Sequence, residues 1–371
     1  MFLLLLIMIL FIITGCGTTT QKQTTANVQA KSDKIRVTDM AGRKVKVPLK
    51  INKLIALGCT LREVEYLDSC DKVVGIEYRE NAKQREGVFP CGKDLPYLIA
   101  HPELGNLPVV SAGNSINYEE IVKLKPDVIF TPVIPTYQAE FLQIKVGIPV
   151  VMVYADPIGT TEQDKQYYDS LNLMGKILGK EKRADEIIKI ITDYQNDLKS
   201  RTKSIPDNKK LKVYIAGRAF CGSQGITGTD PHWPPFEWIN AKNVASLLSN
   251  KGKSINVDKE KLIDWNPDVI FISEASLSTV INDLKDPAYK NINAVKNKKI
   301  YGVLPYCWYA YNKETAIADA YYIGKILYPE KFTDIDPEKK ADEIYQNFVG
   351  KPVYKELKEQ FGGFKEIKVG Q

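Results

Sequence analysis

One short pattern occurs twice in this chain, and it constrains the fold more than any other feature. Pro126–Phe130 and Pro267–Phe271 both read Pro-Asp-Val-Ile-Phe. In each copy an amphipathic stretch runs into the proline, which predicts a short helix that ends there, and the apolar residues after the aspartate predict a buried strand. The copies lie 141 residues apart (position 267 minus position 126), which is the length of a domain and not of a solenoid repeat. The sequence therefore predicts two lobes of related architecture.

The rest of the chain alternates strand-like and helix-like segments around these two units. Such alternation predicts an α/β fold with two Rossmann-like lobes, each built on a mainly parallel sheet covered on both faces. Residues 159–206 carry no strand signal and have apolar residues at helical spacing, so we expect one long rigid α-helix, or two collinear helices, between the lobes. The predicted divisions are 1–15 (signal peptide), 16–34 (tether), 35–158 (N-terminal lobe), 159–206 (linking helix) and 207–371 (C-terminal lobe), with a ligand cleft between the lobes.

The first 14 residues, Met1 to Thr14, form a mostly apolar stretch. This stretch is shorter than the roughly 20 residues that a membrane-spanning helix needs, and its length fits the apolar core of a signal peptide. The stretch ends in Ile13-Thr14-Gly15-Cys16, which resembles a lipobox and makes Cys16 the expected lipid anchor; a plain membrane anchor is the alternative. No Lys or Arg precedes the apolar run, which leaves open whether Met1 is the true start. We therefore expect an extracytoplasmic protein that is lipid-anchored to the outer face of the cell membrane and contacts the membrane through that anchor only.

Charge and motifs exclude several classes of function. A net charge of +6 over 371 residues, without a basic tract, argues against nucleic acid as a partner and is compatible with a weak preference for anionic ligands or surfaces. The chain has no P-loop, no Gly-x-Ser-x-Gly elbow and no Cys-x-x-Cys pair. We expect a monomer that is not an enzyme and has no intrinsic cofactor.

The order of these features resembles the solute-binding lipoproteins of ABC importers for metal chelates. The matching features are the lipobox, the opening Val37-Thr38-Asp39, the strand at Leu54–Leu57 and the repeated unit, and in the mature chain the resemblance runs from about Ile35 to Tyr354. It implies that the protein captures a ferric siderophore, haem or corrinoid and delivers it to a permease that an ATPase drives. It also implies permease docking through one glutamate per lobe, for which Glu103 and Glu237 are the candidates.

Ligand contacts are expected in the loops that follow the strands, because ligands of open parallel sheets meet the carboxyl ends of the strands. Aromatic side chains in these loops suit a bulky chelate, and arginines suit carboxylates. The candidates are Cys59, Arg62, Tyr78, Arg79, Cys91, Thr131, Tyr154, Arg218, Cys221, His232, Trp233, Cys307, Trp308 and Tyr309.

Four cysteines of these loops leave three interpretations open. Cys59, Cys91, Cys221 and Cys307 are suited to bind a soft or borderline transition metal such as nickel or cobalt, to form disulfides, or to pack as small apolar residues. A thiolate set would equally fit a chelatase-like or metal-cluster enzyme on a related bilobal fold. The sequence alone does not choose between these alternatives.

Overall fold

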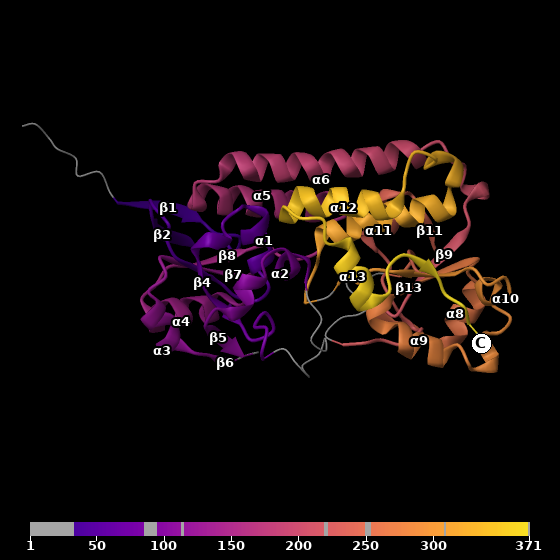
Figure 1. Ribbon diagram of the computed structural model, residues 1–371, viewed down its shortest axis with the longest axis horizontal. Helices are drawn as coiled ribbons and strands as arrows, with labels where there is room; N and C mark the ends of the chain where they lie inside the picture. Colours follow the sequence, from indigo (N-terminus) through magenta and orange to yellow (C-terminus); the bar gives the residue numbers. More distant parts are fainter. Residues whose placement is uncertain are drawn as a thin grey trace, which may run out of the picture. The chain divides into compact units, whose positions relative to one another are not determined.

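Two separate sheets form the framework of the chain in the computed structural model (Figure 1). The structure describes residues 33–84, 95–112, 115–218, 222–248, 254–307 and 309–369. The expected signal peptide, the tether with Cys16, and the candidates Cys91, Cys221 and Trp308 lie outside the described residues. Lys34–Gln371 clusters as one unit by its contacts.

The first sheet has six strands in the order β6-β5-β4-β3-β7-β8. All neighbours are parallel except β5 and β6. The bounds are β3 (Leu54–Ala56), β4 (Val73–Glu77), β5 (Val109–Ala112), β6 (Ser115–Ile116), β7 (Val128–Pro132) and β8 (Val150–Val153). A hairpin precedes this sheet, made of β1 (Lys34–Thr38) and β2 (Lys44–Pro48), which pair antiparallel.

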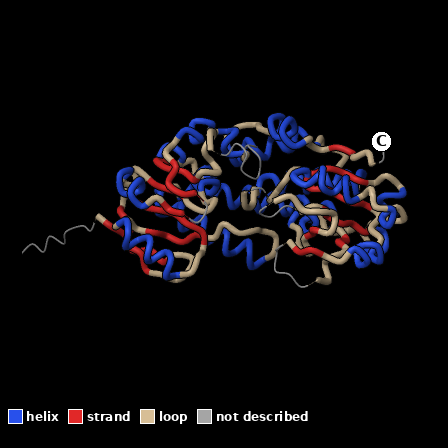
Figure 2. Tube along the Cα trace, turned by 90° about the horizontal axis from the view of Figure 1, so that it is seen from below, coloured by secondary structure: helices blue, strands red, loops and turns tan. Residues whose placement is uncertain are grey.

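The second sheet has the order β11-β9-β13-β14-β15 and is parallel except at β15. Its strands are β9 (Lys212–Ala216), β11 (Lys242–Asn243), β13 (Val269–Ser273), β14 (Ile300–Val303) and β15 (Lys365–Glu366). A small antiparallel pair, β10 (Gly228–Thr229) and β12 (Ile255–Asn256), lies beside it. Figure 2 shows the strands in two groups with helices around and between them. The prediction of two mainly parallel α/β lobes is confirmed.

The repeated unit forms the same structure in both sheets. Its apolar residues are the interior strands β7 and β13, and its aspartates fasten each strand to a neighbour. The Asp127 carboxylate accepts the backbone N–H of Asn52 (2.7 Å) and of Lys53 (2.9 Å), which lead into β3. The Asp268 carboxylate accepts the N–H of Lys212 in β9 at 2.9 Å. In both lobes, the aspartate of the repeat therefore aligns two parallel strands at their amino ends.

Helices cover both faces of each sheet. The α-helices of the first lobe are α1 (Leu61–Tyr66), α2 (Pro96–Ala100), α3 (Tyr118–Leu124) and α4 (Thr136–Val146). Those of the second lobe are α7 (Pro234–Trp238), α8 (Lys259–Trp265), α9 (Leu277–Asp283), α10 (Asn293–Lys296), α11 (Lys313–Leu327), α12 (Pro337–Val349) and α13 (Tyr354–Phe361). Short 3₁₀ turns are η1 (Cys70–Lys72), η2 (Pro102–Asn106), η3 (Asp207–Lys209), η4 (Glu274–Ser276), η5 (Pro287–Tyr289) and η6 (Pro329–Lys331).

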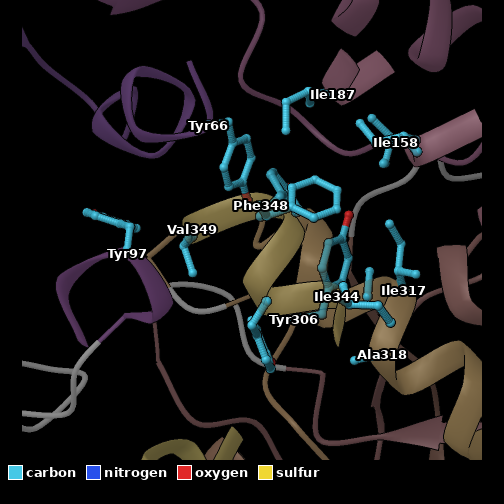
Figure 3. Close-up of a cluster of buried hydrophobic side chains, with 14 of the residues drawn as sticks. Tyr66, Tyr97, Ile158, Ile187, Tyr306, Ile317, Ala318, Ile344, Phe348 and Val349 are labelled. Atoms are coloured by element: carbon cyan, nitrogen blue, oxygen red, sulfur yellow. The ribbon is translucent and has the colours of Figure 1, made fainter. Parts of the chain in front are cut away.

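One hydrophobic core extends through both lobes. Each sheet has a separate apolar cluster on one face, whereas the cluster on the other face is continuous from the first lobe to the second. In Figure 3, Tyr66 of the first lobe lies beside Phe348 of α12, and Tyr97 of the first lobe lies on the side of Val349. The rings of Tyr66 and Phe348 meet edge to face at 5.1 Å. Because this packing would have to break for the lobes to separate, we expect them to move little relative to each other.

The segment between the sheets is a helical hairpin, so the prediction of one long helix or two collinear ones was wrong. Helix α5 (Thr161–Leu178) starts at a capping box on Thr160 and ends at Gly179, whose φ of +68° is favoured by glycine. Helix α6 (Glu181–Thr202) then turns back along α5, and Gln195 donates to the Asp164 carboxylate at 3.2 Å. Helix α6 runs beside both lobes (Figure 1).

We expect Gly175→Ala to destabilise the fold by about 1 kcal/mol. An exposed helical glycine gains up to about 1 kcal/mol on replacement by alanine, but here the new methyl would lie 2.9 Å from Cβ of Ala184, and overpacking costs about 1–3 kcal/mol. Urea unfolding measures the change, with Lys176→Ala on the exposed face of α5 as the control. A more stable Gly175→Ala protein would show that the two helices are less closely packed than described.

Candidate ligand-binding site between the two sheets

The loop after β14 brings the second lobe against the first. The Tyr309 carbonyl accepts a hydrogen bond from Nη2 of Arg62 (2.7 Å), and Oδ1 of Asn312 accepts one from Nε of the same arginine (2.9 Å). The Tyr309 hydroxyl donates to the Glu77 carboxylate at the end of β4. Tyr309 and Ala310 have φ values of +44° and +62°, which non-glycine residues rarely adopt. Contacts across the lobes therefore hold this loop in a strained conformation.

Buried charges at the start of α11 complete the contact between the lobes. Nζ of Lys313 lies 2.9 Å from the Glu63 carboxylate of α1, both side chains are 0% exposed, and the ammonium also donates to the Ala155 carbonyl at 3.2 Å. The next residue, Glu314, accepts a hydrogen bond from the Tyr66 hydroxyl. These residues were not among the sequence candidates, because helical periodicity does not reveal that two charged helix starts face each other.

Arg79 lies where the exits of β4 and β14 meet. Its guanidinium is 5.3 Å from the ring centre of Tyr78 and 5.8 Å from that of Tyr309, so it lies over one aromatic ring from each lobe. All three residues are partly exposed. Three of the sequence candidates therefore come together as a cationic, aromatic surface at the junction of the lobes.

A second arginine is buried at the exit of β9. Arg218 lies 3.3 Å from the Asp230 carboxylate and over the rings of Tyr306 (6.0 Å) and Tyr311 (5.5 Å). Burial opposes its charge, but the surrounding Cys307, Asp230 and tyrosines outweigh burial and raise the pKa of Arg218. Both Tyr306 and Tyr311 belong to the same loop as Tyr309. This loop therefore connects the two arginines. Glu77 is a site residue that the sequence reasoning missed, although it adjoins the candidate Tyr78.

The guanidinium of Arg62 makes its contacts within the protein, which argues against a role in ligand binding. It is fully buried, its polar contacts go to Tyr309, Asn312 and the Cys59 carbonyl, and its guanidinium lies over the Tyr97 ring at 5.4 Å. In this structure Arg62 fastens the lobes together. We propose ligand contact for Arg79 ahead of Arg62.

The remaining candidates take different places. Thr131 is buried at the end of β7, and the Tyr154 hydroxyl after β8 donates to the Pro157 carbonyl at 3.1 Å. Trp233 is 2% exposed and packs edge to face on Phe236 at 4.7 Å, whereas the neighbouring His232 is half-exposed, 3.5 Å from Glu237. Glu237 in α7 and Glu103 in η2 both reach the surface, as docking would require.

The described cysteines show how burial governs thiol chemistry here. Burial raises the pKa of the Cys59 thiol to about 12, so it is protonated at neutral pH. Cys307 is buried too, and Cys70 lies elsewhere, beside Glu65. Within the described residues, no group of three or more His, Cys, Asp or Glu side chains is arranged to hold a metal ion. A metal site that includes Cys91 and Cys221 stays a prediction, because both lie outside those residues.

We expect stability to fall as pH rises from about 4.5 to about 8. Burial and, second, the nearby Glu77 raise the pKa of Glu80 from its usual 4.5 to about 8, so the folded protein retains a proton that the unfolded chain has released. The loss is up to about 1.4 kcal/mol per pH unit. Replacing Glu80 by glutamine keeps an acceptor for the Tyr97 hydroxyl (2.8 Å) and should flatten this dependence in urea unfolding. Equal slopes for both proteins would contradict this assignment.

Two α/β lobes with a shared core, and strand exits that meet across a cationic junction, define a bilobal solute-binding protein. Residues 78–306 match the model of the periplasmic binding protein family, and the chain belongs to that family. None of the helices in the described ranges combines the length and the hydrophobicity that crossing a bilayer requires.

Three relatives illustrate the range of the family. The molybdate-binding protein MolA of Haemophilus influenzae is 30% identical over 342 residues, which cover 86% of this chain and 92% of MolA. The solved structure of MolA bound to molybdate aligns with a TM-score of 0.67 and 26% identity, over 86% of this chain and 98% of that one. The uncharacterised ABC transporter substrate-binding lipoprotein YvrC of Bacillus subtilis is 22% identical (78% of this chain, 85% of YvrC). The iron-uptake system-binding protein of the same organism is 27% identical (50% and 57%).

MolA and YvrC are named as binding proteins of ABC transporters, and the third relative is named as the binding protein of an iron-uptake system.

Proposed function

We propose that the chain is the extracytoplasmic binding component of an ABC importer, that it holds an anionic solute between its lobes, and that it delivers this solute to a permease. The observation that best supports this proposal is the position of the Arg79 guanidinium, which lies over the ring of Tyr78 in one lobe and over the ring of Tyr309 in the other. A guanidinium at this junction can pair with an anion that contacts both lobes. The proposal includes no bond-making step, and the cleft needs no resident cofactor.

The solute class that we favour is a small oxyanion of the molybdate type. The similarity to MolA supports it, as do the positive net charge and the protonated state of Cys59, which leaves that thiol a poor ligand for a bare metal. An oxyanion needs hydrogen-bond donors and no soft ligand, and the arginine and tyrosine side chains of the junction are donors.

A metal chelate is the second candidate. The tyrosines around the junction present flat apolar faces with polar tips, which suit a ferric siderophore, haem or corrinoid, and one relative is an iron-uptake binding protein. Capture of bare nickel or cobalt rests on the cysteine loops alone and is the third choice.

We also propose that Cys16 carries a lipid that holds the protein on the outer face of the membrane, and that Glu103 and Glu237 contact the permease. The divisions at residues 35, 159 and 207 remain proposals for the limits of tether, lobes and linking segment.

Calorimetric titration separates the ligand classes. Residues 17–371 should bind molybdate with one-to-one saturation, and ferric citrate, haem, cobalamin, Ni(II) and Co(II) should give weaker or no heats. Saturation by a ferric chelate alone would favour the second candidate. Saturation by Ni(II) or Co(II) alone would favour the third and overturn the anion proposal.

A further inference from the structure

The outer face of the first hairpin is basic. Lys34 and Arg36 on β1 and Lys44 and Lys46 on β2 are exposed, whereas Val37, Val45 and Val47 between them are buried. The alternation of a strand places the four basic side chains on one side of the hairpin. Arg43 at the turn does not belong to this face, because it pairs with Asp39 at 2.8 Å.

The same face forms one wall of a shallow groove of about 540 Å³. The opposite wall comes from the end of α4 and the turn into β8, and includes Gln143, Ile144 and Ile148. Ile144 is 78% exposed, and among the described residues that line the groove there is no carboxylate. Cations beside an exposed aliphatic side chain are the combination by which peripheral proteins recognise anionic membrane surfaces.

Position in the fold separates this groove from the ligand site. Gly147, Ile148 and Pro149 lead into the amino end of β8, whereas the junction of the lobes lies at the carboxyl ends of the strands. The basic hairpin is also where the folded unit begins, directly after the 33 residues that include the apolar leader and Cys16. A membrane anchor in that segment would be joined to the folded unit at this hairpin, because the chain enters the unit at Lys34.

We propose that the hairpin face of Lys34, Arg36, Lys44 and Lys46 binds the anionic headgroups of the membrane surface. The proposal rests on the extracytoplasmic location proposed above but not on the identity of the solute. Contact at this face would keep the anchored domain against the bilayer while the ligand site, at the other end of the strands, stays accessible. Each basic residue near an anionic surface changes the partition coefficient by roughly fivefold.

Vesicle sedimentation tests this without the lipid. Residues 17–371 contain the whole folded unit, and vesicles of phosphatidylglycerol and phosphatidylcholine supply the anionic surface. We expect binding at low salt that weakens strongly at 0.5 M salt, since the Debye length falls to a few Å. The variant with Lys34, Arg36, Lys44 and Lys46 all changed to glutamine should bind at least about 100-fold less.

A charge-matched control excludes a general effect of net charge. Changing the exposed Lys285, Lys290, Lys296 and Lys299 of the second lobe to glutamine removes the same charge and should leave vesicle binding within about twofold, since these residues are remote from the hairpin. Equal losses in the two variants, or binding of the unchanged protein to pure phosphatidylcholine as strong as to the anionic vesicles, would overturn the proposal. Solute titration of the hairpin variant should be unchanged, so failure here is distinguishable from failure of the proposed function.

Discussion

Lys313→Met should destabilise the protein by about 3–5 kcal/mol, the largest effect that we expect from a single substitution. The ammonium is the partner of a Glu63 carboxylate that is 0% exposed, and its removal leaves that carboxylate buried without a countercharge. The hydrogen bond to the Ala155 carbonyl is lost as well. Since natural domains are stable by about 5–15 kcal/mol, the urea midpoint should shift far to lower concentration.

Two further variants make this result specific to burial. Lys165→Met breaks the exposed pair with Asp169, whose side chains are 75% and 52% exposed, and should cost less than about 1 kcal/mol. The double variant Glu63→Leu with Lys313→Met removes both buried charges and should recover much of the lost stability. If Lys313→Met costs no more than Lys165→Met, the buried pair is not what holds α1 against α11.

Arg79→Gln should weaken binding of the anionic solute by about 10- to 150-fold. A hydrogen bond to a charged group is worth about 1.5–3 kcal/mol, which corresponds to that range of affinity. Arg79 is partly exposed, so its loss should leave the fold intact. Arg79→Lys keeps the charge without the planar guanidinium, so its affinity for the solute should lie between those of the unchanged protein and of Arg79→Gln. Calorimetric titration with molybdate measures all three proteins.

Arg36→Gln is the matched control for this series. It removes the same side chain from the basic hairpin, away from the junction of the lobes, and should leave solute affinity unchanged. Full affinity in a folded Arg79→Gln protein would remove the arginine from the site and with it the observation that carries the proposed function.

The repeated unit explains why the architecture was predictable from the sequence. Its proline, aspartate and three apolar residues each have a local consequence, and in the structure each copy is an interior strand whose aspartate binds the backbone of a neighbouring strand. The helical hairpin was not foreseen, because apolar periodicity gives the face of a helix but not its direction. Gly179 was the available signal, and a left-handed glycine is the usual end of a helix.

The site was predictable only in part, because burial decides which candidate side chains remain available. The rule that ligands meet the carboxyl ends of parallel strands located Arg79, Arg218 and Tyr309 in one region. The same rule did not distinguish Arg79 from Arg62. The guanidinium of Arg62 donates hydrogen bonds to Tyr309 and Asn312, which lie 247 and 250 residues away in the sequence. Nor did the rule reveal that Cys59 would be buried and its pKa raised. Such pairings arise from tertiary packing and have no local signal.

Anomalous diffraction at the molybdenum edge, from crystals grown with molybdate, would locate a bound oxyanion in the protein. We expect one strong peak at the junction of the lobes, within hydrogen-bonding reach of Arg79 and of the loop that carries Tyr309 and Tyr311. A peak elsewhere in the molecule, or no peak in crystals of protein that binds molybdate in solution, would contradict it.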